Sequence, residues 1–488
     1  MQPNRKKERF LLPGNSGKYF GKDPFLNMEN NAKENGAMNI HFIGVGGVSM
    51  STLAAVSAKG GMTVTGSDRA PSAVTERLEK SGIRVFCPQS AENLDKAGRI
   101  DRVVYTAAIP EDNPELKEAR RRGIPCMRRS EYLGQLMKQY SVRIGVSGTH
   151  GKSSTTGMLA HLFLEAGKNP TVACGAELCE LHSAYRLGGS EHFVYEACEY
   201  KDAFLDFFPT VAVMLNMEMD HVDYYHSMEQ MERSYISSAK DAKAVVLNGD
   251  DPHLRSVAER LKGVWVVKAG VNSIDCDYRA ADIQMKGGFA SFDFYKENEK
   301  LARICLGVPG RHHVYNALCA GAAAHLCGLS PKEIAKGIGT YQGILRRFEY
   351  KGQHKGAKIY DDYAHHPTEI AATLRTAKEM LPEGGRLFCV FQPHTYSRTA
   401  GLFEDFVKAL SLCDRLYLAP IYAAREQNTY GVSSEQLAER IQGAECLQTF
   451  EEIAGRLESE LSEGDILLTM GAGNAYKAGE LLISEDRE

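Results

Sequence analysis

The chain lacks the features that mark several common classes of protein. It has 12 cysteines in 488 residues, but no C-x-x-C pair and none of the regular spacing of a disulfide-stapled module. The cysteines are therefore expected to be small buried residues in a reducing cytosol, with a zinc site built from Cys198 and nearby histidines as the alternative. No apolar run approaches the roughly 20 residues that cross a bilayer, so no membrane span or membrane partner is expected.

A strong charge imbalance and an export signal are also missing. The formal net charge is -4, from 58 basic and 62 acidic residues, so no basic surface for nucleic acid is indicated. Residues 1–37 are polar and show neither helical nor strand periodicity, which predicts a flexible extension. Within it, Phe10–Leu12 is followed at once by Pro13–Gly14, too short an apolar stretch for a signal peptide. A cytoplasmic location is therefore expected.

What the chain does contain is a repeated alternation of strand-like and helix-like segments, typical of an α/β fold. Its length suggests about three domains at roughly 150 residues each. We expect a Rossmann-like parallel sheet in residues 38–138, a P-loop ATPase-like α/β domain in 139–343 and a second Rossmann-like domain in 344–488. Between about 276 and 306 the hydrophobic period changes to two, which predicts an antiparallel insertion in the central domain.

The strongest local signal is the stretch from Val142 to Thr156. It begins as a β-branched run, passes through a glycine turn and continues as a helix. Such a loop directs backbone N–H groups and the positive end of the helix at one point, which suits a phosphate. Lys152 can reach phosphate oxygens and the Ser153 hydroxyl can ligate Mg²⁺. Because Val146 replaces a glycine of the strict pattern, the match is to the shorter variant Gly148-Thr-His-Gly-Lys-Ser153, and an ordinary βα turn stays the alternative.

A second glycine turn, Gly44-Val-Gly-Gly-Val-Ser49, follows the first predicted strand. It approaches a dinucleotide fingerprint, but Ser49 stands in place of the third glycine. Asp68 lies where an acidic ribose partner would be expected. The turn is compatible with NAD, with another nucleotide diphosphate, or with an unliganded structural role.

Acidic residues and histidines gather after two central strands, where open α/β sheets present ligands. They are Tyr195–Glu199 and Asn216–Asp223. Glu196 is the best candidate for Mg²⁺, which prefers carboxylate and hydroxyl oxygens. His221 could serve a second ion or transition-state charge, or be a surface histidine. In the third domain, Asp361–Pro367 and Phe391–Thr399 form either a binding edge or two polar loops.

Taken together, these segments resemble the Mur ligases, over residues 38 to about 485. The motifs that carry the resemblance are Gly44–Met50, Gly148–Ser153, Glu196, Asn216–His221, Gly310–Asn316, Arg346–Phe348, Asp362–Pro367 and Gln392–Thr399. The resemblance implies an ATP- and Mg²⁺-dependent ligase of bacterial cell-wall synthesis. It implies further that L-alanine is joined to the lactoyl carboxylate of UDP-N-acetylmuramate through an acyl phosphate.

The resemblance also assigns residues to roles. The ATP-binding set is Gly148, Thr149, His150, Gly151, Lys152, Ser153, Ser154, His312, Asn316, Arg347 and Asp362. The catalytic set is Lys152, Glu196, His221 and Arg347, and the metal ligands are Ser153, Glu196 and His221. The UDP-sugar set is Gly44, Gly46, Gly47, Ser49 and Asp68, and the amino-acid set is Tyr363, His365 and Arg398.

Some positions depart from the family pattern. Cys198 and Lys201 stand where many relatives have aspartates, so neither is expected to be a ligand. Thr395 replaces a basic residue, so Arg398 is expected to contribute more to binding the amino acid.

The alternative functions are a ligase that adds a recycled tripeptide to UDP-N-acetylmuramate, an NAD-dependent oxidoreductase built on Gly44–Asp68, and a non-catalytic nucleotide-sensing module. A monomer or weak homodimer is expected.

Overall fold

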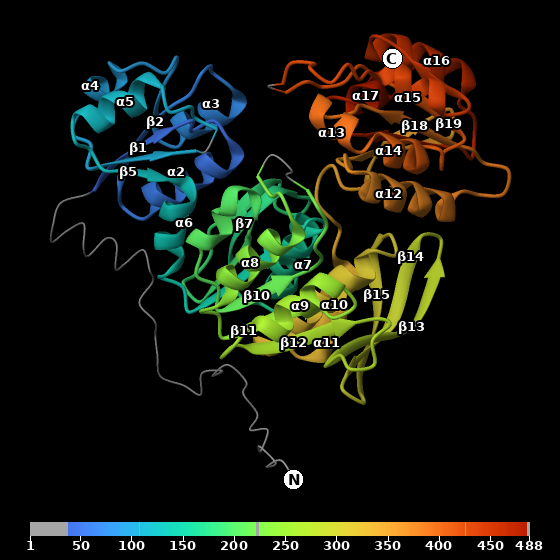
Figure 1. Ribbon diagram of the computed structural model, residues 1–488, viewed down its shortest axis with the longest axis horizontal. Coiled ribbons are helices and arrows are strands. Elements are labelled where there is room, and N and C mark those ends of the chain that lie inside the picture. The colour runs from blue at the N-terminus through green and yellow to red at the C-terminus, as the bar shows by residue number, and fades with distance from the viewer. Residues whose placement is uncertain (1–37, 107, 221–223, 425, 486–488) are drawn as a thin grey trace. The chain divides into compact units, whose positions relative to one another are not determined.

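The computed structural model describes residues 38–106, 108–220, 224–424 and 426–485 (Figure 1). The predicted extension, residues 1–37, lies outside them. The chain forms two compact units. The first comprises residues up to 279 together with 294–302 and 315–338, and the second comprises 280–293, 303–314 and the residues from 339 onward.

The N-terminal part of the first unit is a five-stranded sheet in the order β3-β2-β1-β4-β5, and every pairing in it is parallel. Its strands are β1 (Asn39–Ile43), β2 (Thr63–Ser67), β3 (Arg84–Phe86), β4 (Arg102–Tyr105) and β5 (Cys126–Arg128). Its helices are α2 (Val48–Lys59), α3 (Ala73–Lys80), α4 (Asn93–Ala97), α5 (Pro114–Arg121) and α6 (Arg129–Met137). The strand order reverses at β1, so the turn after β1 lies at the switch point where such sheets bind ligands.

The second sheet has ten strands in the order β15-β14-β13-β12-β11-β10-β6-β9-β7-β8. Its parallel centre consists of β6 (Val142–Ser147), β9 (His192–Glu196), β10 (Val211–Met214), β11 (Ala244–Asn248) and β12 (Trp265–Gly270). β7 (Thr171–Leu178) runs parallel to β9 and antiparallel to β8 (Ser183–Arg186). The order reverses at β6, so the loop after β6 also occupies a switch point.

The antiparallel insertion is β13 (Tyr278–Lys286), β14 (Phe289–Lys296) and β15 (Glu299–Pro309), joined by connections too short for a parallel crossover. The helical elements of this region are α7 (Lys152–Glu165), the 3₁₀ segment η1 (Tyr200–Asp206), α8 (Met228–Ala239), α9 (Pro252–Arg260), α10 (His313–Leu326) and α11 (Pro331–Thr340). The predicted change of hydrophobic period near residue 276 therefore corresponds to a real change of strand direction.

A six-stranded sheet, in the order β16-β17-β21-β18-β19-β20, forms the core of the second unit. Its strands are β16 (Glu349–His354), β17 (Ala357–Asp362), β18 (Leu387–Phe391), β19 (Arg415–Leu418), β20 (Ala444–Cys446) and β21 (Ile466–Met470). Its helices are α12 (Pro367–Met380), α13 (Tyr396–Gly401), α14 (Phe403–Leu410), α15 (Ser434–Arg440), α16 (Phe450–Glu460) and α17 (Tyr476–Glu485). Only the edge strand β16 pairs antiparallel.

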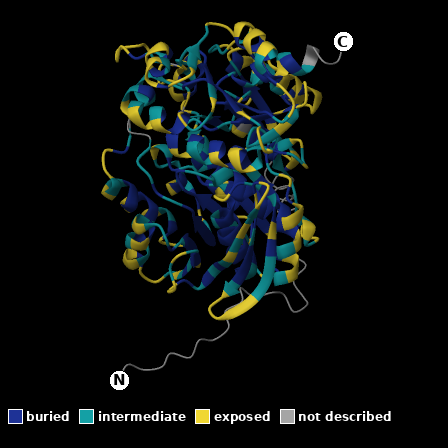
Figure 2. Cartoon of the chain, turned by 90° about the vertical axis from the view of Figure 1, so that its right-hand side faces the viewer, coloured by how far each residue is buried: buried dark blue, intermediate teal, exposed yellow. Residues whose placement is uncertain are grey.

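The burial pattern agrees with helices covering both faces of these sheets. Strands such as β10, β18 and β21 are buried along their whole length, whereas exposed residues lie on the outer helices and on strands of the antiparallel insertion (Figure 2). Among the described helices, none combines the length and apolar character needed to cross a membrane. The predicted α/β class, with a parallel N-terminal sheet, a central domain with an antiparallel insertion and a third sheet, is confirmed. The boundaries at 138/139 and 343/344 stay a prediction.

One glycine in α6 marks a close approach of two backbone segments. A Cβ atom on Gly134 would lie 2.0 Å from the carbonyl oxygen of Asp206 in η1. Gly134→Ala is therefore expected to lower the free energy of unfolding by about 1–3 kcal/mol or more, because the two backbones must separate. The measurement is the urea midpoint followed by circular dichroism.

The matched control for this prediction is Gly455→Ala in α16, where the added methyl would meet no atom within 4 Å. There alanine should stabilise the helix by about 1 kcal/mol. A gain of stability in Gly134→Ala, like the gain expected for Gly455→Ala, would show that α6 and η1 are not packed as described.

Candidate active site

The loop between β6 and α7 contains two glycines whose φ angles are positive. Gly148 has φ +143° and Gly151 has φ +82°. A Cβ on Gly148 would lie 3.0 Å from Leu215 Cβ, and one on Gly151 would lie 2.7 Å from the Oδ1 of Asn316 in α10. The loop therefore requires glycine at both positions, for conformation and for space. Asn316, predicted to bind ATP, lies directly against it.

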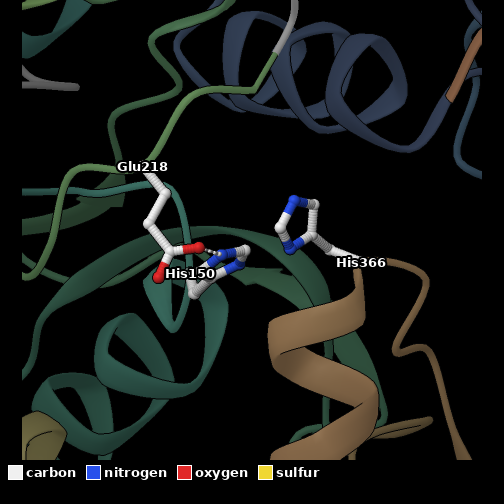
Figure 3. A group of neighbouring side chains, drawn as sticks. All are labelled: His150, Glu218 and His366. Carbon is white, nitrogen blue, oxygen red and sulfur yellow. Dashed lines mark hydrogen bonds and ion pairs between the residues drawn. The ribbon is translucent and has the colours of Figure 1, made fainter. Parts of the chain in front are cut away.

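The same loop is held to the segment after β10 by reciprocal hydrogen bonds. The backbone N–H of His150 donates to Asn216 Oδ1 at 2.8 Å, and Asn216 Nδ2 donates to the His150 carbonyl at 3.0 Å. The Thr149 hydroxyl donates to the carbonyl of Glu218 at 3.1 Å. The His150 ring and the Glu218 carboxylate are 3.1 Å apart (Figure 3). These contacts fix the loop conformation without using the Lys152 side chain.

Lys152 begins α7 and directs its ammonium back into the loop. Its Nζ donates to the carbonyl oxygens of Gly148 at 2.6 Å and Thr149 at 3.2 Å, and it pairs with the fully buried Glu199 carboxylate at 3.0 Å. Burial opposes the charged form, but the neighbouring Glu199 outweighs it and raises the pKa of Lys152. The ammonium is therefore charged at neutral pH, as a phosphate ligand must be.

Ser153 and Glu196 bring a hydroxyl and a carboxylate together beside the loop. Ser153 Oγ donates to Glu196 Oε2 at 2.7 Å, and the N–H of Gly175 donates to the same oxygen at 2.9 Å. Both ligand atoms are hard oxygens, the type that Mg²⁺ prefers. The two predicted ligands that lie among the described residues are thus adjacent and of suitable chemistry. His221, the third predicted ligand and a predicted catalytic residue, lies outside the described residues.

The zinc alternative gains no support from the surroundings of Cys198. Burial raises the pKa of the Cys198 thiol to about 11, so the thiol is protonated at neutral pH. Within the described part of the chain, no group of three or more potential metal ligands includes Cys198. Its thiol fits the role of a small buried side chain.

The turn after β1 is shaped by Gly44 and by a contact between Gly46 and Asp68. Gly44 has φ +84°. The N–H of Gly46 donates to Asp68 Oδ2 at 2.7 Å, and a Cβ on Gly46 would lie 2.8 Å from that oxygen. Gly47 precedes α2 and gives it no side-chain cap. The Ser49 hydroxyl accepts a hydrogen bond from Arg129 Nη1 at 3.0 Å. The predicted UDP-sugar residues are therefore brought together at one switch point.

In the second unit, Asp362 ends β17 and accepts two backbone hydrogen bonds. Its carboxylate oxygens accept from the N–H groups of Ala364 at 2.7 Å and Phe348 at 2.8 Å. Burial raises the pKa of Asp362 to about 6, against the opposing effect of Arg347. Arg347 itself lies 3.6 Å from the Glu369 carboxylate and over the ring of Tyr363.

The predicted amino-acid residues lie around the strand ends of the same sheet. The rings of Tyr363 and His365 meet edge to face at 5.4 Å between centroids, and His365 Nδ1 lies 3.0 Å from the Tyr363 carbonyl. Arg398 Nη1 lies 3.3 Å from His394, whose ring centroid is 6.1 Å from that of His365. The structure thus brings Tyr363, His365 and Arg398 into one neighbourhood, with His394 between them.

The remaining predicted ATP residues divide between the units. Ser154 is buried in the first turn of α7, in the first unit. His312 belongs to the second unit, next to His313, with a ring centroid distance of 4.2 Å. Burial lowers the pKa of His312 to about 4, so it is neutral at physiological pH. His366 is the N-cap residue of α12 (Figure 3), and its Nδ1 accepts a hydrogen bond from the N–H of Thr368 at 3.4 Å.

Sequence reasoning gave no role to three residues of these sites. Glu199 belongs to the predicted Tyr195–Glu199 cluster, and its position after a strand end was the available signal. Asn216 begins a family motif, but its contact with His150 depends on strand order. Arg129 carried no signal, because a second arginine beside Arg128 resembles an ordinary charged surface.

A pH prediction arises from His365. Burial lowers its pKa to about 4 from the ordinary 6.5. The unfolded chain therefore binds the proton more readily, so stability present above pH 6.5 is lost as the pH falls toward 4. When the pH is lowered from about 7.5 to about 5, the unfolding free energy of both proteins is expected to fall. The fall should be about 1–2 kcal/mol smaller in His365→Gln than in the unmodified protein. Urea unfolding at both pH values measures the difference.

The exposed His226 provides the control for this prediction. His226→Gln should keep the pH dependence of the unmodified protein. An identical pH dependence in the His365 variant would mean that solvent reaches the imidazole freely.

Three domain models of one protein family match consecutive parts of this chain. They are the Mur ligase family catalytic domain at residues 39–141, the Mur ligase middle domain at 146–324 and the Mur ligase glutamate ligase domain at 346–473. A UDP-N-acetylmuramate–L-alanine ligase of Clostridium perfringens is 43% identical over 451 residues, which cover 91% of this chain and 97% of the relative.

Solved structures agree with this match. The crystal structure of a UDP-N-acetylmuramate-alanine ligase from Thermotoga maritima superposes with a TM-score of 0.78 at 27% identity, covering 92% of this chain and 99% of that one. A murein peptide ligase from Psychrobacter arcticus gives 0.66 at 23% identity, covering 92% and 98%, and shows the fold alone. The chain belongs to the Mur ligase family of ATP-dependent, amide-forming ligases.

Proposed function

We propose that this enzyme joins L-alanine to the lactoyl carboxylate of UDP-N-acetylmuramate while ATP is converted to ADP and phosphate. The observation that carries the proposal is the glycine loop with Lys152 at its centre and the Ser153–Glu196 pair beside it. This arrangement suits phosphoryl transfer. The substrates are inferred from the Clostridium perfringens relative, which is similar along nearly the whole chain.

The chemistry requires activation because a carboxylate is a poor electrophile. A carboxylate oxygen attacks the γ-phosphorus of ATP, the bond to the β,γ-bridging oxygen breaks, and ADP leaves. The resulting acyl phosphate is attacked by the amine of L-alanine after it has lost a proton. The C–O bond to phosphate then breaks, which gives the amide and inorganic phosphate. The protein contributes mainly position and charge stabilisation.

Individual residues are proposed for these tasks. Lys152 neutralises charge on the β- and γ-phosphates, and Arg347 is proposed to act on the γ-phosphate. Ser153 and Glu196, with His221, would hold Mg²⁺, which supplies further neutralisation of phosphate charge. Asn316, with His312, is proposed to hold adenine, and Asp362 the ribose of ATP.

The other substrates are proposed to bind at the remaining strand ends. The turn Gly44–Ser49, with Asp68 fixing its shape, would take UDP. Tyr363, His365 and Arg398 would take L-alanine, with the Arg398 guanidinium facing the carboxylate. Because the departure at Thr395 removes a basic residue, Arg398 is expected to be the main cation of that pocket.

The test is phosphate release from ATP and Mg²⁺ in the presence of UDP-N-acetylmuramate, with L-alanine, L-serine, glycine or the cell-wall tripeptide as acceptor. Release that needs both the sugar nucleotide and L-alanine is expected. Release only with the tripeptide would assign the enzyme to the recycling reaction, which the fold alone does not distinguish.

Two alternative functions, an oxidoreductase and a nucleotide-sensing module, would each give a different experimental result. Tight NADH binding without ATP turnover would favour an oxidoreductase. Here Asp68 already accepts the N–H of Gly46, so it is committed to the shape of the turn. Nucleotide binding without ADP release would indicate a sensing module.

A further inference from the structure

Two consecutive arginines stand at the start of α6, and they differ in how their charges are balanced. Arg128 pairs with Glu131 at 3.1 Å and Asp206 at 3.5 Å. Arg129 makes a single described hydrogen bond, to the neutral hydroxyl of Ser49. None of the described ion pairs includes Arg129. The first turn of a helix also disfavours a cation, because the helix dipole is positive there.

The surroundings add to the cost of placing a cation here. The Arg129 side chain is intermediate in exposure. Burial nevertheless lowers the pKa of its guanidinium, against the opposing influence of Cys198 and Glu196. In two other partly buried arginines, several of the guanidinium N–H donors have hydrogen-bond partners within the protein. Arg143 donates to two backbone carbonyls, and Arg346 donates to two carbonyls and pairs with Asp361. Arg129 therefore keeps most of its five donors for another partner.

The position of Arg129 indicates what that partner is. β5 ends at the same edge of the parallel sheet as β1, and Arg129 contacts Ser49 in the first turn of α2. The start of a helix that follows a glycine turn favours phosphate, and a guanidinium matches phosphate oxygens in a two-point contact. A nucleotide diphosphate at this turn would supply the missing negative charge.

We propose that Arg129, held against Ser49 at the start of α2, is a substrate-binding residue that contacts the diphosphate of the UDP-sugar. This inference rests on the proposed function, since it needs a uridine diphosphate at the Gly44–Ser49 turn.

The test compares dissociation constants of UDP, UMP, UDP-N-acetylmuramate and ATP for the full-length protein and for Arg129→Gln, Arg129→Lys and Arg128→Gln. Arg129→Gln should weaken UDP and UDP-N-acetylmuramate by the same factor, about 10–100-fold, as expected for a lost charge-assisted hydrogen bond. UMP should be affected less, ATP should be unaffected, and Arg129→Lys should recover part of the loss. Arg128→Gln should change none of the constants.

Kinetics give a second readout. KM for UDP-N-acetylmuramate should rise in Arg129→Gln, while KM for ATP and for L-alanine stay constant. A purely structural arginine would instead lower the thermal midpoint and alter all three constants.

Three results would overturn the assignment. Unchanged UDP affinity in a folded Arg129→Gln variant would remove Arg129 from the site. Weaker UDP-N-acetylmuramate binding with unchanged UDP binding would place the guanidinium on the sugar or its carboxylate. Failure of the unmodified protein to bind either UDP compound would overturn the proposed function, and this inference with it. The first two results, in contrast, would overturn only the role of Arg129.

Discussion

Lys152→Ala is expected to abolish ligation while leaving the affinity for UDP-N-acetylmuramate unchanged. The ammonium is proposed to stabilise the charge of the transferring phosphoryl group, and losing one such preorganised contact costs on the order of 10²-fold or more in kcat. The UDP-sugar turn belongs to a different sheet, so its binding should persist. Phosphate release and calorimetric binding of the sugar nucleotide measure the two quantities separately.

Removing Lys152 also takes the ammonium away from the buried Glu199 carboxylate, which lies 3.0 Å from it. Breaking a buried pair costs about 3–5 kcal/mol of stability, so activity could be lost through unfolding. The double variant Lys152→Ala, Glu199→Gln removes both charges and should recover the thermal midpoint without recovering activity. Recovery of activity in the double variant, or equal loss of both functions in a folded single variant, would contradict the role given to Lys152.

Glu196→Gln should lower kcat by about 10²–10³-fold and raise the Mg²⁺ concentration needed for half-maximal activity. The amide can still accept hydrogen bonds from Ser153 and from the N–H of Gly175, which donate to Glu196 at 2.7 and 2.9 Å, so the local fold should persist. What the amide removes is the negative charge proposed to hold the metal ion. Activity measured across a Mg²⁺ titration separates a weaker metal site from a slower chemical step.

The matched control is Glu191→Gln, because Glu191 immediately precedes β9 while Glu196 ends it, and its side chain is 67% exposed. That variant should keep both kcat and the Mg²⁺ dependence. If Glu196→Gln behaved in the same way, the carboxylate would have to be excluded as a metal ligand.

Much of the fold follows from local sequence because hydrophobic period and glycine turns are local properties. The strand, glycine turn and helix order around Gly44 and around Gly148 is visible in the sequence, and both turns lie at switch points of their sheets. The β7–β8 hairpin and the edge strand β16 are among the elements that were not predicted. The β7–β8 hairpin contains an irregular register between Ala173 and Leu178, and β16 is a polar edge strand interrupted at Gly352. Each breaks the alternation on which strand prediction depends.

The site residues were predictable to the extent that each belongs to a local sequence motif. Ser153 was proposed as a Mg²⁺ ligand from the phosphate-loop motif and Glu196 from its position at a strand end, and the structure has their side chains 2.7 Å apart. The pairing of Lys152 with Glu199 and the contact of Arg129 with Ser49 join residues distant in sequence. Such contacts depend on the order of strands in a sheet, which single-sequence reasoning does not provide.

The second unit of the fold is not a continuous stretch of chain. It includes residues 280–293 and 303–314, which are separated from its main part by segments of the first unit. Two glycines in these segments pack closely on α12. A Cβ on Gly288 would lie 2.5 Å from Met380, and one on Gly310 would lie 3.3 Å from the Thr376 hydroxyl. A gene fragment that starts at residue 344 would therefore encode a C-terminal sheet whose α12 surface is uncovered. In evolution by exchange of gene segments, the portable piece would have to begin well upstream, inside the antiparallel insertion.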